Sequence, residues 1–555
     1  MEDERVKSTR GKEIEGKFPG RPGYAKMGRA IVLRTNYLHL KPEVQARLFR
    51  YTVSGLDGLS RTKKRRVMEI ILNGHRALHG VTAASDYATT IVTPTRIPLG
   101  QDGNQNRERS ELVLHAADEP PFPVATPNDP PEMVAARTRR TVRFGIEFNQ
   151  SFTIDQLVEY LRANFSGSFF SDKLEIVQLM NIVLARAPNL ADNVVASGIG
   201  KFYPTIPHPM VEAEDLGGGL QALRGYYSSV RTATNRILIN LNVASAAFYK
   251  PIPLQALMDE FVGRGNRNGG QMRKLEPFLK MLRVRTSYLK KLDANQKPVL
   301  GPDRKPVTIP KVKTIIGFAR APQYGNAKQV KFRLTDPQDS TKTTTVTVYD
   351  YFKQHHQIDL QHWQEPVLNV GTSGDPSYLP VELCTVLPGQ AVKKLLSGDQ
   401  TSTMITFAAR PPHMNAMSIT GTTASPGNGV TLFNLRQDQQ ALSVRPFGLQ
   451  VVPEMLTVPG RILDSPGLQY GGNKKMQPRN GSWNLANTRF VAPGSFKRWG
   501  CLVINVANRG QTLRGDANQL MSHLEAALKG YGMNTGTFSG ARPLDIPPVT
   551  PENRQ

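Results

Sequence analysis

Cysteine is nearly missing from this sequence, whose 555 residues hold only Cys384 and Cys501. Two cysteines supply neither a disulfide framework nor a zinc site made of cysteines, which argues for a reducing compartment. Long apolar runs are missing too, and no stretch approaches the ~20 apolar residues of a membrane helix. The opening residues, MEDERVKSTRGKEIEG, are charged and lack the apolar segment of a secretory signal. We therefore expect no membrane partner and a location in the cytoplasm or the nucleus.

Sequence motifs of enzyme active sites are also missing. There is no GxSxG nucleophile motif, and the glycine-rich LGGG at 216–219 lacks the Lys-Ser/Thr of a nucleotide loop. Adjacent His355 and His356, with His362 and Cys384, are the best candidates for metal ligands. However, neighbours on one helix diverge by about 100°, whereas paired ligands favour i, i+3 or i+4 spacing, and no HExxH motif is present. We expect no active site, no metal and no cofactor, and a metal-dependent hydrolase built on these histidines is a remote alternative.

Negative charge is scarce relative to positive charge. The chain has 70 Lys and Arg against 45 Asp and Glu, a net charge of +25. The excess is concentrated in residues 261–314, where 14 basic side chains face only Glu276, Asp293 and Asp303, a local net charge of +11. So dense a positive segment repels itself unless an anion lies against it, which favours nucleic acid as the partner. A basic protein with another role is the alternative.

The length of the chain, with its 41 prolines and 47 glycines, predicts three to five domains built from short elements. Apolar periodicity predicts helices at 154–165, 173–188 and 255–265. Branched and aromatic residues predict strands at 30–40 and 236–249.

Four segments are assigned mainly from composition. Residues 99–140 are rich in Pro, Asn, Asp and Glu, which indicates an inserted surface loop. GRGNRNGGQMRK (263–274) is typical of a flexible linker, and the polar residues 411–440 of another loop. TTTVTVYDYF (343–352) is typical of a strand in a small β-barrel.

A final βα unit is predicted near the end of the chain. RWGCLVINVA (498–507) is an apolar strand, and the helix that follows has Asp516 as its expected N-cap. Its leucines, Leu520, Leu524 and Leu528, are spaced for one apolar stripe.

Aromatic and basic residues alternate around one short stretch, TVYDYFKQHHQIDL (347–360). About one helical turn holds Tyr351, Lys353, His355 and His356. Bases stack on rings at ~1–3 kcal/mol each, while imidazoles, hydroxyls and ammoniums bind phosphate oxygens. The stretch therefore favours binding of a single-stranded nucleic-acid end, although Phe352 is more typical of a core residue.

Several motifs, in order along the chain, resemble the eukaryotic Argonaute family, particularly its filamentous-fungal members. The resemblance extends over nearly all residues from Gly28 to the end. The segments that carry it are RPGY, IVLRTNY, LGGGLQALRGYYSSVRTATNRILINLNVASAAFYKP, TVYDYFKQHHQIDL, SYLPVELCTVLPGQ, DQTSTMI, VPGRILDSPGLQYGG, GSWNLANTRFV and FKRWGCLVINV.

The resemblance implies a mixed α+β multidomain protein. The implied parts are an N domain, a first linker domain, a PAZ domain with an OB-like β-barrel, a second linker domain and the start of a Rossmann-like MID domain. With a disordered basic tail at 1–27, their expected bounds are 28–190, 191–252, 253–420, 421–494 and 495–555.

The resemblance also implies a pocket for the 3′ end of a small RNA. Tyr351 stands where the family has a phosphate-binding tyrosine, and His356 replaces a second tyrosine, which makes that position sensitive to pH. Tyr378 stands where the terminal ribose is met, and Phe332 where a ring underlies the last base. Tyr288 occupies a position that is often histidine.

Two lysines extend the implied pocket. Lys311 and Lys313 stand near a family arginine and tyrosine, beside an insertion at 289–310 that leaves this part of the alignment open. Lysine in place of arginine keeps the charge but loses bidentate geometry. The set is completed by the neighbouring Lys353, His355 and Leu379.

The expected function is that of a small-RNA-binding protein in RNA silencing. Its partners would be single-stranded guide RNA, or an siRNA duplex with a 3′ overhang, and other silencing proteins. The slicer carboxylates of the family lie in the PIWI domain, which would follow Gln555, so we expect the chain as given to bind RNA without cutting it. The alternative is a protein-interaction or dominant-negative module with little affinity for RNA.

Overall fold

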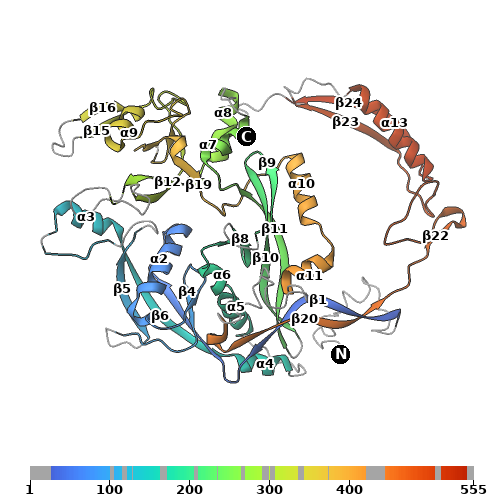
Figure 1. Ribbon diagram of the computed structural model, residues 1–555. Helices are drawn as coiled ribbons and strands as arrows, with labels where there is room; N and C mark the ends of the chain where they lie inside the picture. Colours follow the sequence, from blue (N-terminus) through green and yellow to red (C-terminus); the bar gives the residue numbers. More distant parts are fainter. Residues whose placement is uncertain are drawn as a thin grey trace. The chain divides into compact units, whose positions relative to one another are not determined.

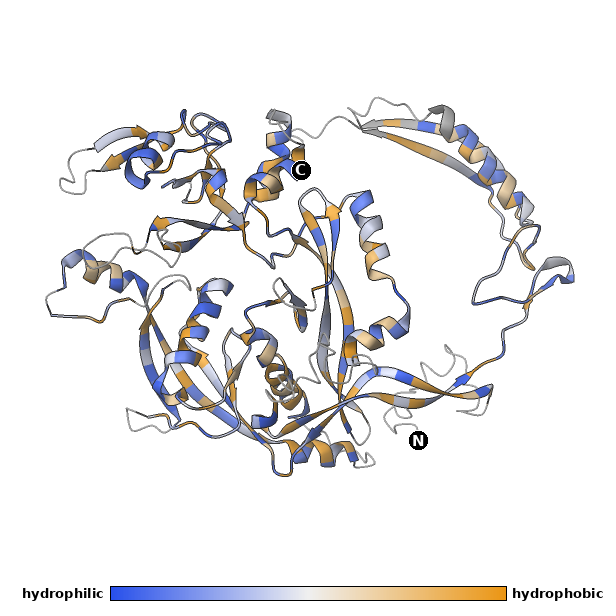
Figure 2. Cartoon of the chain, viewed as in Figure 1, coloured by the Kyte–Doolittle hydropathy of each residue, from blue (hydrophilic) through white to orange (hydrophobic). Residues whose placement is uncertain are grey.

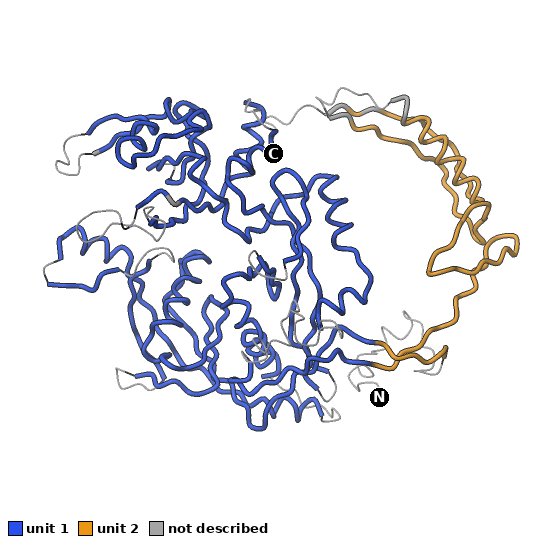
Figure 3. The backbone as a smooth tube through the Cα atoms, in the orientation of Figure 1, with its two compact units in different colours: residues 1–15, 34–457 blue, residues 16–33, 458–555 orange. Residues whose placement is uncertain are grey.

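The computed structural model describes most of the chain in two compact units (Figure 3). One unit comprises residues 1–15 and 34–457, and the other comprises residues 16–33 and 458–555. The described residues are 27–100, 106–115, 122–127, 129–162, 172–205, 211–233, 236–263, 269–290, 299, 307–335, 343–372, 374–420, 444–506 and 514–546.

An antiparallel five-stranded sheet, in the order β3-β4-β2-β6-β5, lies in the N-terminal part of the first unit (Figure 1). Its inner face packs on helix α2 (Arg61–Gly74), which begins after Ser60, whose hydroxyl accepts a hydrogen bond from Lys63 N at 3.4 Å. Apolar side chains at alternate strand positions fill this core. The strands are β2 (Arg47–Ser54), β3 (Ala84–Ser85), β4 (Thr90–Thr93), β5 (Arg107–Val113) and β6 (Thr141–Thr153), with a short η1 (Arg76–Leu78) after α2.

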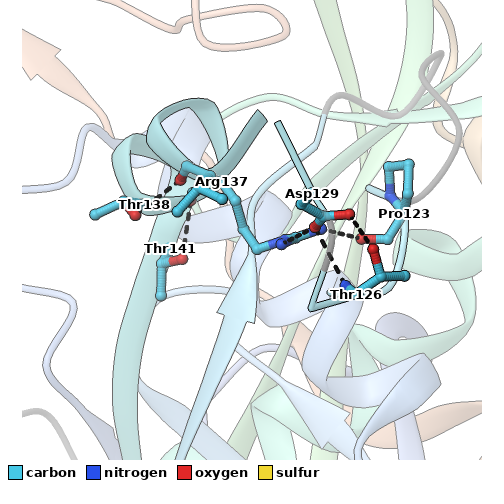
Figure 4. Close-up of polar contacts among 7 residues, drawn as sticks. Pro123, Thr126, Asp129, Arg137, Thr138 and Thr141 are labelled. Carbon is cyan, nitrogen blue, oxygen red and sulfur yellow. Dashed lines mark hydrogen bonds and ion pairs between the residues drawn. The ribbon is translucent and has the colours of Figure 1, made fainter. Parts of the chain in front are cut away.

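The prediction of a loop over 99–140 is wrong for two of its parts. Strand β5 pairs along its length with β6, and Pro131–Arg140 form helix α3. A polar network holds the segment before α3 (Figure 4), in which Arg137 donates to Asp129 Oδ2 at 2.6 Å and to Pro123 O at 3.0 Å. Hydrogen bonds from Thr126 and Arg137 lower the pKa of Asp129. Local sequence propensity did not predict β5 and α3, because cross-strand and side-chain hydrogen bonds stabilise them.

A second sheet has seven strands in the order β20-β1-β11-β10-β8-β7, with β9 beside β10. The antiparallel β10–β11 hairpin pairs without a break from Leu220↔Tyr249 to Ala233↔Arg236, and β11 confirms the strand predicted at 236–249. Helices α4 and α5 pack on it and fill a core with Leu157, Leu161 and Leu179. The elements are β1 (Arg29–Pro42), α4 (Ile154–Arg162), α5 (Lys173–Leu184), α6 (Arg186–Leu190), β7 (Val194–Ala196), β8 (Lys201–Pro204), β9 (Ala213–Gly217), β10 (Leu220–Ala233), β11 (Arg236–Tyr249), η3 (Arg445–Phe447) and β20 (Leu449–Ile462).

The third region of this unit combines helices with three small sheets, ordered β13-β12-β19, β14-β17-β18 and β15-β16. Two predictions are corrected here, because Gly269–Leu279 form helix α8 rather than a linker and Val348–His356 form helix α9 rather than the end of a strand. The remaining elements are α7 (Leu254–Val262), β12 (Arg283–Lys290), β13 (Thr308–Thr314), β14 (Gly317–Phe318), β15 (Lys331–Thr335), β16 (Thr343–Thr347), β17 (Leu368–Asn369), β18 (Tyr378–Leu379), η2 (Val381–Leu383) and β19 (Cys384–Val386).

Helices α10 (Gly398–Ala408) and α11 (Pro412–Thr420) follow, so part of the loop predicted over 411–440 is helical, and residues 421–440 lie outside the described residues. Arg224 on β10 donates to Glu212 Oε2 at 2.7 Å and to Phe407 O at 2.6 Å. Arg410 lies 3.5 Å from the same Glu212 carboxylate. The buried Arg224 thus links the long hairpin to α10, and the half-buried Arg410 joins Glu212 to Ser418 of α11, which it meets at 2.6 Å.

In the second unit β23 (Arg498–Val506) and β24 (Thr537–Ile546) are parallel, and α13 (Arg514–Gly530) connects them. The helix begins at Arg514, so Asp516 lies inside it rather than at its N-cap. Leu520 and Leu524 are 62% and 43% exposed, so part of the predicted apolar stripe has no covering partner among the described residues. Hydrophilic and hydrophobic colours alternate along α13 in Figure 2. The unit also contains β21 (Leu468–Gln469), η4 (Gly471–Asn473) and β22 (Lys475–Met476).

No helix in the described part of the chain is long and apolar enough to cross a membrane. Both cysteines are free thiols, and Cys384 is buried.

Candidate nucleic-acid interface

Helix α9 carries the aromatic and basic residues singled out in the sequence. Thr347 caps it, accepting a hydrogen bond from Asp350 N at 3.0 Å, and Gln357 ends it in the left-handed conformation. Val348 and Phe352, four residues apart, are buried and fix the helix to the core. Tyr351 and His355, also four residues apart, share another face of the helix, where Tyr351 is half-buried and His355 is exposed. One face of α9 therefore packs on the core, and the other faces outward.

Five half-buried rings form a continuous cluster. Tyr378 and Phe332 have centroids 6.4 Å apart, and Phe332 meets Tyr351 edge-on at 5.2 Å. Tyr351 meets His356 at 5.3 Å, and His356 meets Tyr288 at 4.9 Å. The structure therefore brings together all five aromatic or imidazole positions that the resemblance implied.

The polar tips of this ring cluster are unused. The structure shows no hydrogen bond from the hydroxyls of Tyr288, Tyr351 or Tyr378, or from the imidazole of His356, to any other described residue. None of these polar atoms is among the buried unsatisfied ones, so they remain reachable by solvent. Four donors on one cluster of rings are thus available to a ligand.

A β-bulge positions Tyr288. The register of β12 and β13 runs from Thr286↔Lys311 to Leu289↔Ile309, so two residues of β12 stand opposite Pro310 alone. Proline has no N–H to donate to the ladder, which suits the interruption, and a bulge re-aims the side chains around it. The ring of Tyr288 consequently reaches both Phe352 at 5.1 Å and His356.

Lys311 and Lys313 lie on the inner face of this sheet. They stand directly opposite Thr286 and Val284, both of which are buried. Both lysines are half-buried, and no carboxylate of a described residue pairs with either. A half-buried lysine without an acid favours an anionic ligand, because its charge is only partly hydrated.

The environment sets the protonation of two ring-cluster members. Burial, with the nearby charges of His355 and Lys290, lowers the pKa of His356. Burial, with Tyr351 and Cys384 nearby, raises the pKa of Tyr288, which keeps its hydroxyl a donor. Lys290 was not anticipated from the sequence, and no local signal distinguishes it from the other lysines of its segment.

The three remaining predicted residues have different surroundings. His355 is exposed and its ring lies 5.0 Å from that of Tyr351. Lys353 faces Asp359 at 3.9 Å, and Leu379 is 3% exposed. His355 thus belongs to the rim of the ring cluster and Leu379 to the core behind it.

Metal ligation was the other interpretation of these histidines. Within the described ranges, no group of three or more His, Cys, Asp or Glu side chains is arranged to hold a metal ion. Cys384 lies in the core, and burial raises the pKa of its thiol far above the ordinary value.

Three regions of the chain match described protein domains. Residues 29–184 match the N-terminal domain of argonaute, residues 198–250 the Argonaute linker 1 domain and residues 320–405 the PAZ domain. The chain belongs to the Argonaute family. The PAZ match contains α9 and most of the ring cluster, and Tyr288 and the two lysines precede it.

Similar Argonaute proteins are longer than this chain. Protein argonaute 14 of Oryza sativa subsp. japonica is 25% identical over 500 residues, which cover 87% of this chain and 40% of that protein. Protein argonaute 4 of Arabidopsis thaliana is 26% identical over 504 residues, covering 88% of this chain and 50% of that protein. The crystal structure of Kluyveromyces polysporus Argonaute with a guide RNA shares the fold, with a TM-score of 0.58 and 16% identity, covering 96% of this chain and 57% of that one. The chain therefore spans about half the length of its relatives.

Proposed function

We propose that the ring cluster on α9 binds the 3′ end of a small RNA. The observation that carries this proposal is the set of unused donors on Tyr288, Tyr351, Tyr378 and His356, gathered on rings that are themselves half-buried. A single-stranded end offers what this surface lacks, namely phosphate acceptors and flat bases. The Kluyveromyces polysporus protein, which shares the fold, was crystallised with a guide RNA.

Each residue has a distinct task in this proposal. Tyr351 and His356 donate to the last phosphate, and Tyr378 donates to the terminal ribose. Phe332 underlies the last base, where base–aromatic stacking contributes ~1–3 kcal/mol. Tyr288, held by its bulge, supports the imidazole of His356.

The charged residues draw the RNA to the ring cluster. Lys311 and Lys313 supply positive charge from the inner face of the neighbouring sheet, and His355 offers its ring nitrogens at the rim. Lys353 Nζ lies 3.9 Å from Asp359 Oδ1, and this carboxylate partly compensates its charge. We therefore assign Lys353 a weaker contact with the RNA at the edge of the site.

The wider interpretation of the chain is part of the same proposal. We assign 421–494 to a second linker domain and 495–555 to the start of a MID domain, which the parallel β23–α13–β24 unit supports. We also propose that the chain as given binds RNA in the cytoplasm or nucleus without cutting it. A ribonuclease assay with guide and complementary target in Mg²⁺ tests the last point, and any cleavage dependent on this chain would refute it.

The decisive experiment compares matched short RNAs with a free or a blocked 3′ end by fluorescence anisotropy. The free end should bind more tightly, and Tyr351→Ala should remove the difference. If about four phosphates are neutralised, log K should fall with log salt at a slope near −3, from ~0.7 per phosphate on single strands. Equal affinity for both ends, or a flat salt response, would favour the protein-interaction module instead.

A further inference from the structure

A row of arginines crosses the outer face of the five-stranded sheet, which is distant in sequence from α9. Strand alternation places Glu108, Phe144 and Ile146 toward the core, each 5% exposed or less. Their neighbours Arg107, Arg109 and Arg143 therefore lie on the opposite face.

These arginines surround a shallow hollow of about 620 Å³. The floor of the hollow is formed by small residues. Arg109 stands opposite Gly145 in the register of β5 and β6, and Gly145 in turn stands opposite Ser54 of β2. A Cβ at position 145 would lie 2.9 Å from Ser54 Oγ and 3.9 Å from Arg107 Nε. A side chain at this position would therefore crowd Ser54 on the floor of the hollow, and the glycine keeps that part of the floor open.

The charge in the hollow is poorly compensated. Arg107 Nε is buried without a hydrogen-bond partner, and Arg107 and Arg109 form no ion pair with any described residue. Arg143 meets Glu111 at 3.5 Å, but both side chains are largely exposed, so that pair is weak. Glu147 stands opposite Arg107 on the same face and forms no ion pair within the described part of the chain. Glu108 points inward, where Arg76 donates to it at 3.0 Å.

We propose that this arginine hollow is a second contact site for RNA, which it binds through the phosphodiester backbone. The choice of RNA rests on the proposed function, whereas the anionic character of the ligand rests on the arginines alone. Guanidinium groups match phosphate oxygens in a bidentate fashion. Alternate residues on one strand are ~6.8 Å apart, which is comparable to the spacing of successive phosphates. An acidic protein is the less suitable partner, because no exposed aromatic side chain borders the hollow to act as an anchor; the side chain of Phe144, a lining residue, points to the core and is 5% exposed.

The test is the double variant Arg109→Gln/Arg143→Gln in the full chain, measured with RNAs whose 3′ ends are free or blocked. Both RNAs should bind roughly tenfold more weakly at low salt, by the same factor. The slope of log K against log salt should shrink by about 1.4, because two phosphates are no longer neutralised. Both arginines are exposed, so the melting temperature should not change.

The matched control is Lys201→Gln/Arg236→Gln, which removes two exposed positive charges from the seven-stranded sheet. This control should change affinity less than twofold, and Glu111→Gln should strengthen binding by removing the acid beside Arg143. If the arginine variant binds both RNAs like the control, the hollow is not an RNA site. If the blocked and free ends bind equally but the arginine variant still weakens both, the hollow stands and only the 3′-end proposal fails.

Discussion

We expect the ring cluster on α9 and the arginine hollow on β5 and β6 to bind a ligand by different physical means. The ring cluster exposes half-buried rings above the buried Phe352, whereas the hollow exposes guanidinium groups around a glycine. Stacking acts at contact distance and is little affected by salt, whereas charge attraction extends over a Debye length of ~8–10 Å and is screened. We therefore expect affinity for any RNA to depend on the hollow, and selectivity for an RNA end to depend on the ring cluster.

The largest effect is expected from a substitution in the core beneath the ring cluster, which should change stability. Phe352→Ala should lower the free energy of unfolding by about 3–5 kcal/mol, because a 2% exposed ring is replaced by a cavity. Thermal or denaturant unfolding measures this loss. Tyr351→Phe is the control and should melt like wild type. Should the alanine variant retain wild-type stability, α9 is not anchored through this ring.

The next largest effect is expected from a substitution that alters the ring cluster but not the arginine hollow. Tyr351→Ala should weaken binding of a free 3′ end by roughly tenfold or more, since one stacked base or phosphate hydrogen bond is worth ~1–3 kcal/mol. Unlike the arginine variant, it should leave the salt slope nearly unchanged. Anisotropy titrations at three salt concentrations measure both quantities. A flattened slope without loss of end selectivity would contradict the division between the two sites.

A smaller effect is expected from the two half-buried lysines. Lys311→Gln/Lys313→Gln should weaken binding a few-fold and reduce the salt slope by about 0.7 for each phosphate that is no longer neutralised. The control, Arg283→Gln/Arg285→Gln, removes the same charge from exposed positions of the paired strand β12. Equally weakened binding in the two double variants would show that only the net charge of this region matters.

The smallest effect is the response to pH. Burial and the charges of His355 and Lys290 lower the pKa of His356, so the imidazole is neutral at neutral pH and gains a proton on acidification. The added charge lies beside the other ring-cluster donors, so affinity should rise about two- to fivefold as the pH falls below about 6.5, the ordinary pKa of an imidazole. His356→Gln should remove most of this rise, whereas His355→Gln should preserve it. A rise that persists in His356→Gln would assign the titration to another group.

Much of the fold was predictable where the signal is local. The amphipathic spacing of Leu157 and Leu161 predicted α4, and the branched residues of 236–249 predicted β11, because in both cases the sequence determines which side is buried. The ring positions of the candidate site were predictable from the family resemblance, and the structure brings them together.

A helix cap, burial in the core and non-local strand pairing account for the elements that local sequence patterns did not predict. The β-branched run before Tyr351 suggested a strand, but the Thr347 cap and the burial of Val348 and Phe352 four residues apart favour a helix. Strand β5 lies in a polar segment and becomes regular only by pairing with β6. The arginine hollow was invisible for the same reason, since Arg109 and Gly145 become neighbours only through that register.

The pairing of β1 with β20 has a consequence for synthesis of the chain. The hydroxyl of Thr35 donates to Leu456 O at 2.8 Å across a sequence separation of 421 residues. During translation the edge of β1 that β20 covers stays open while the intervening residues emerge, and an open edge is a template for pairing with other chains. Such a long separation also slows folding of the sheet, because its last strand arrives late. We therefore expect the nascent chain to need protection at this edge until β20 has been synthesised.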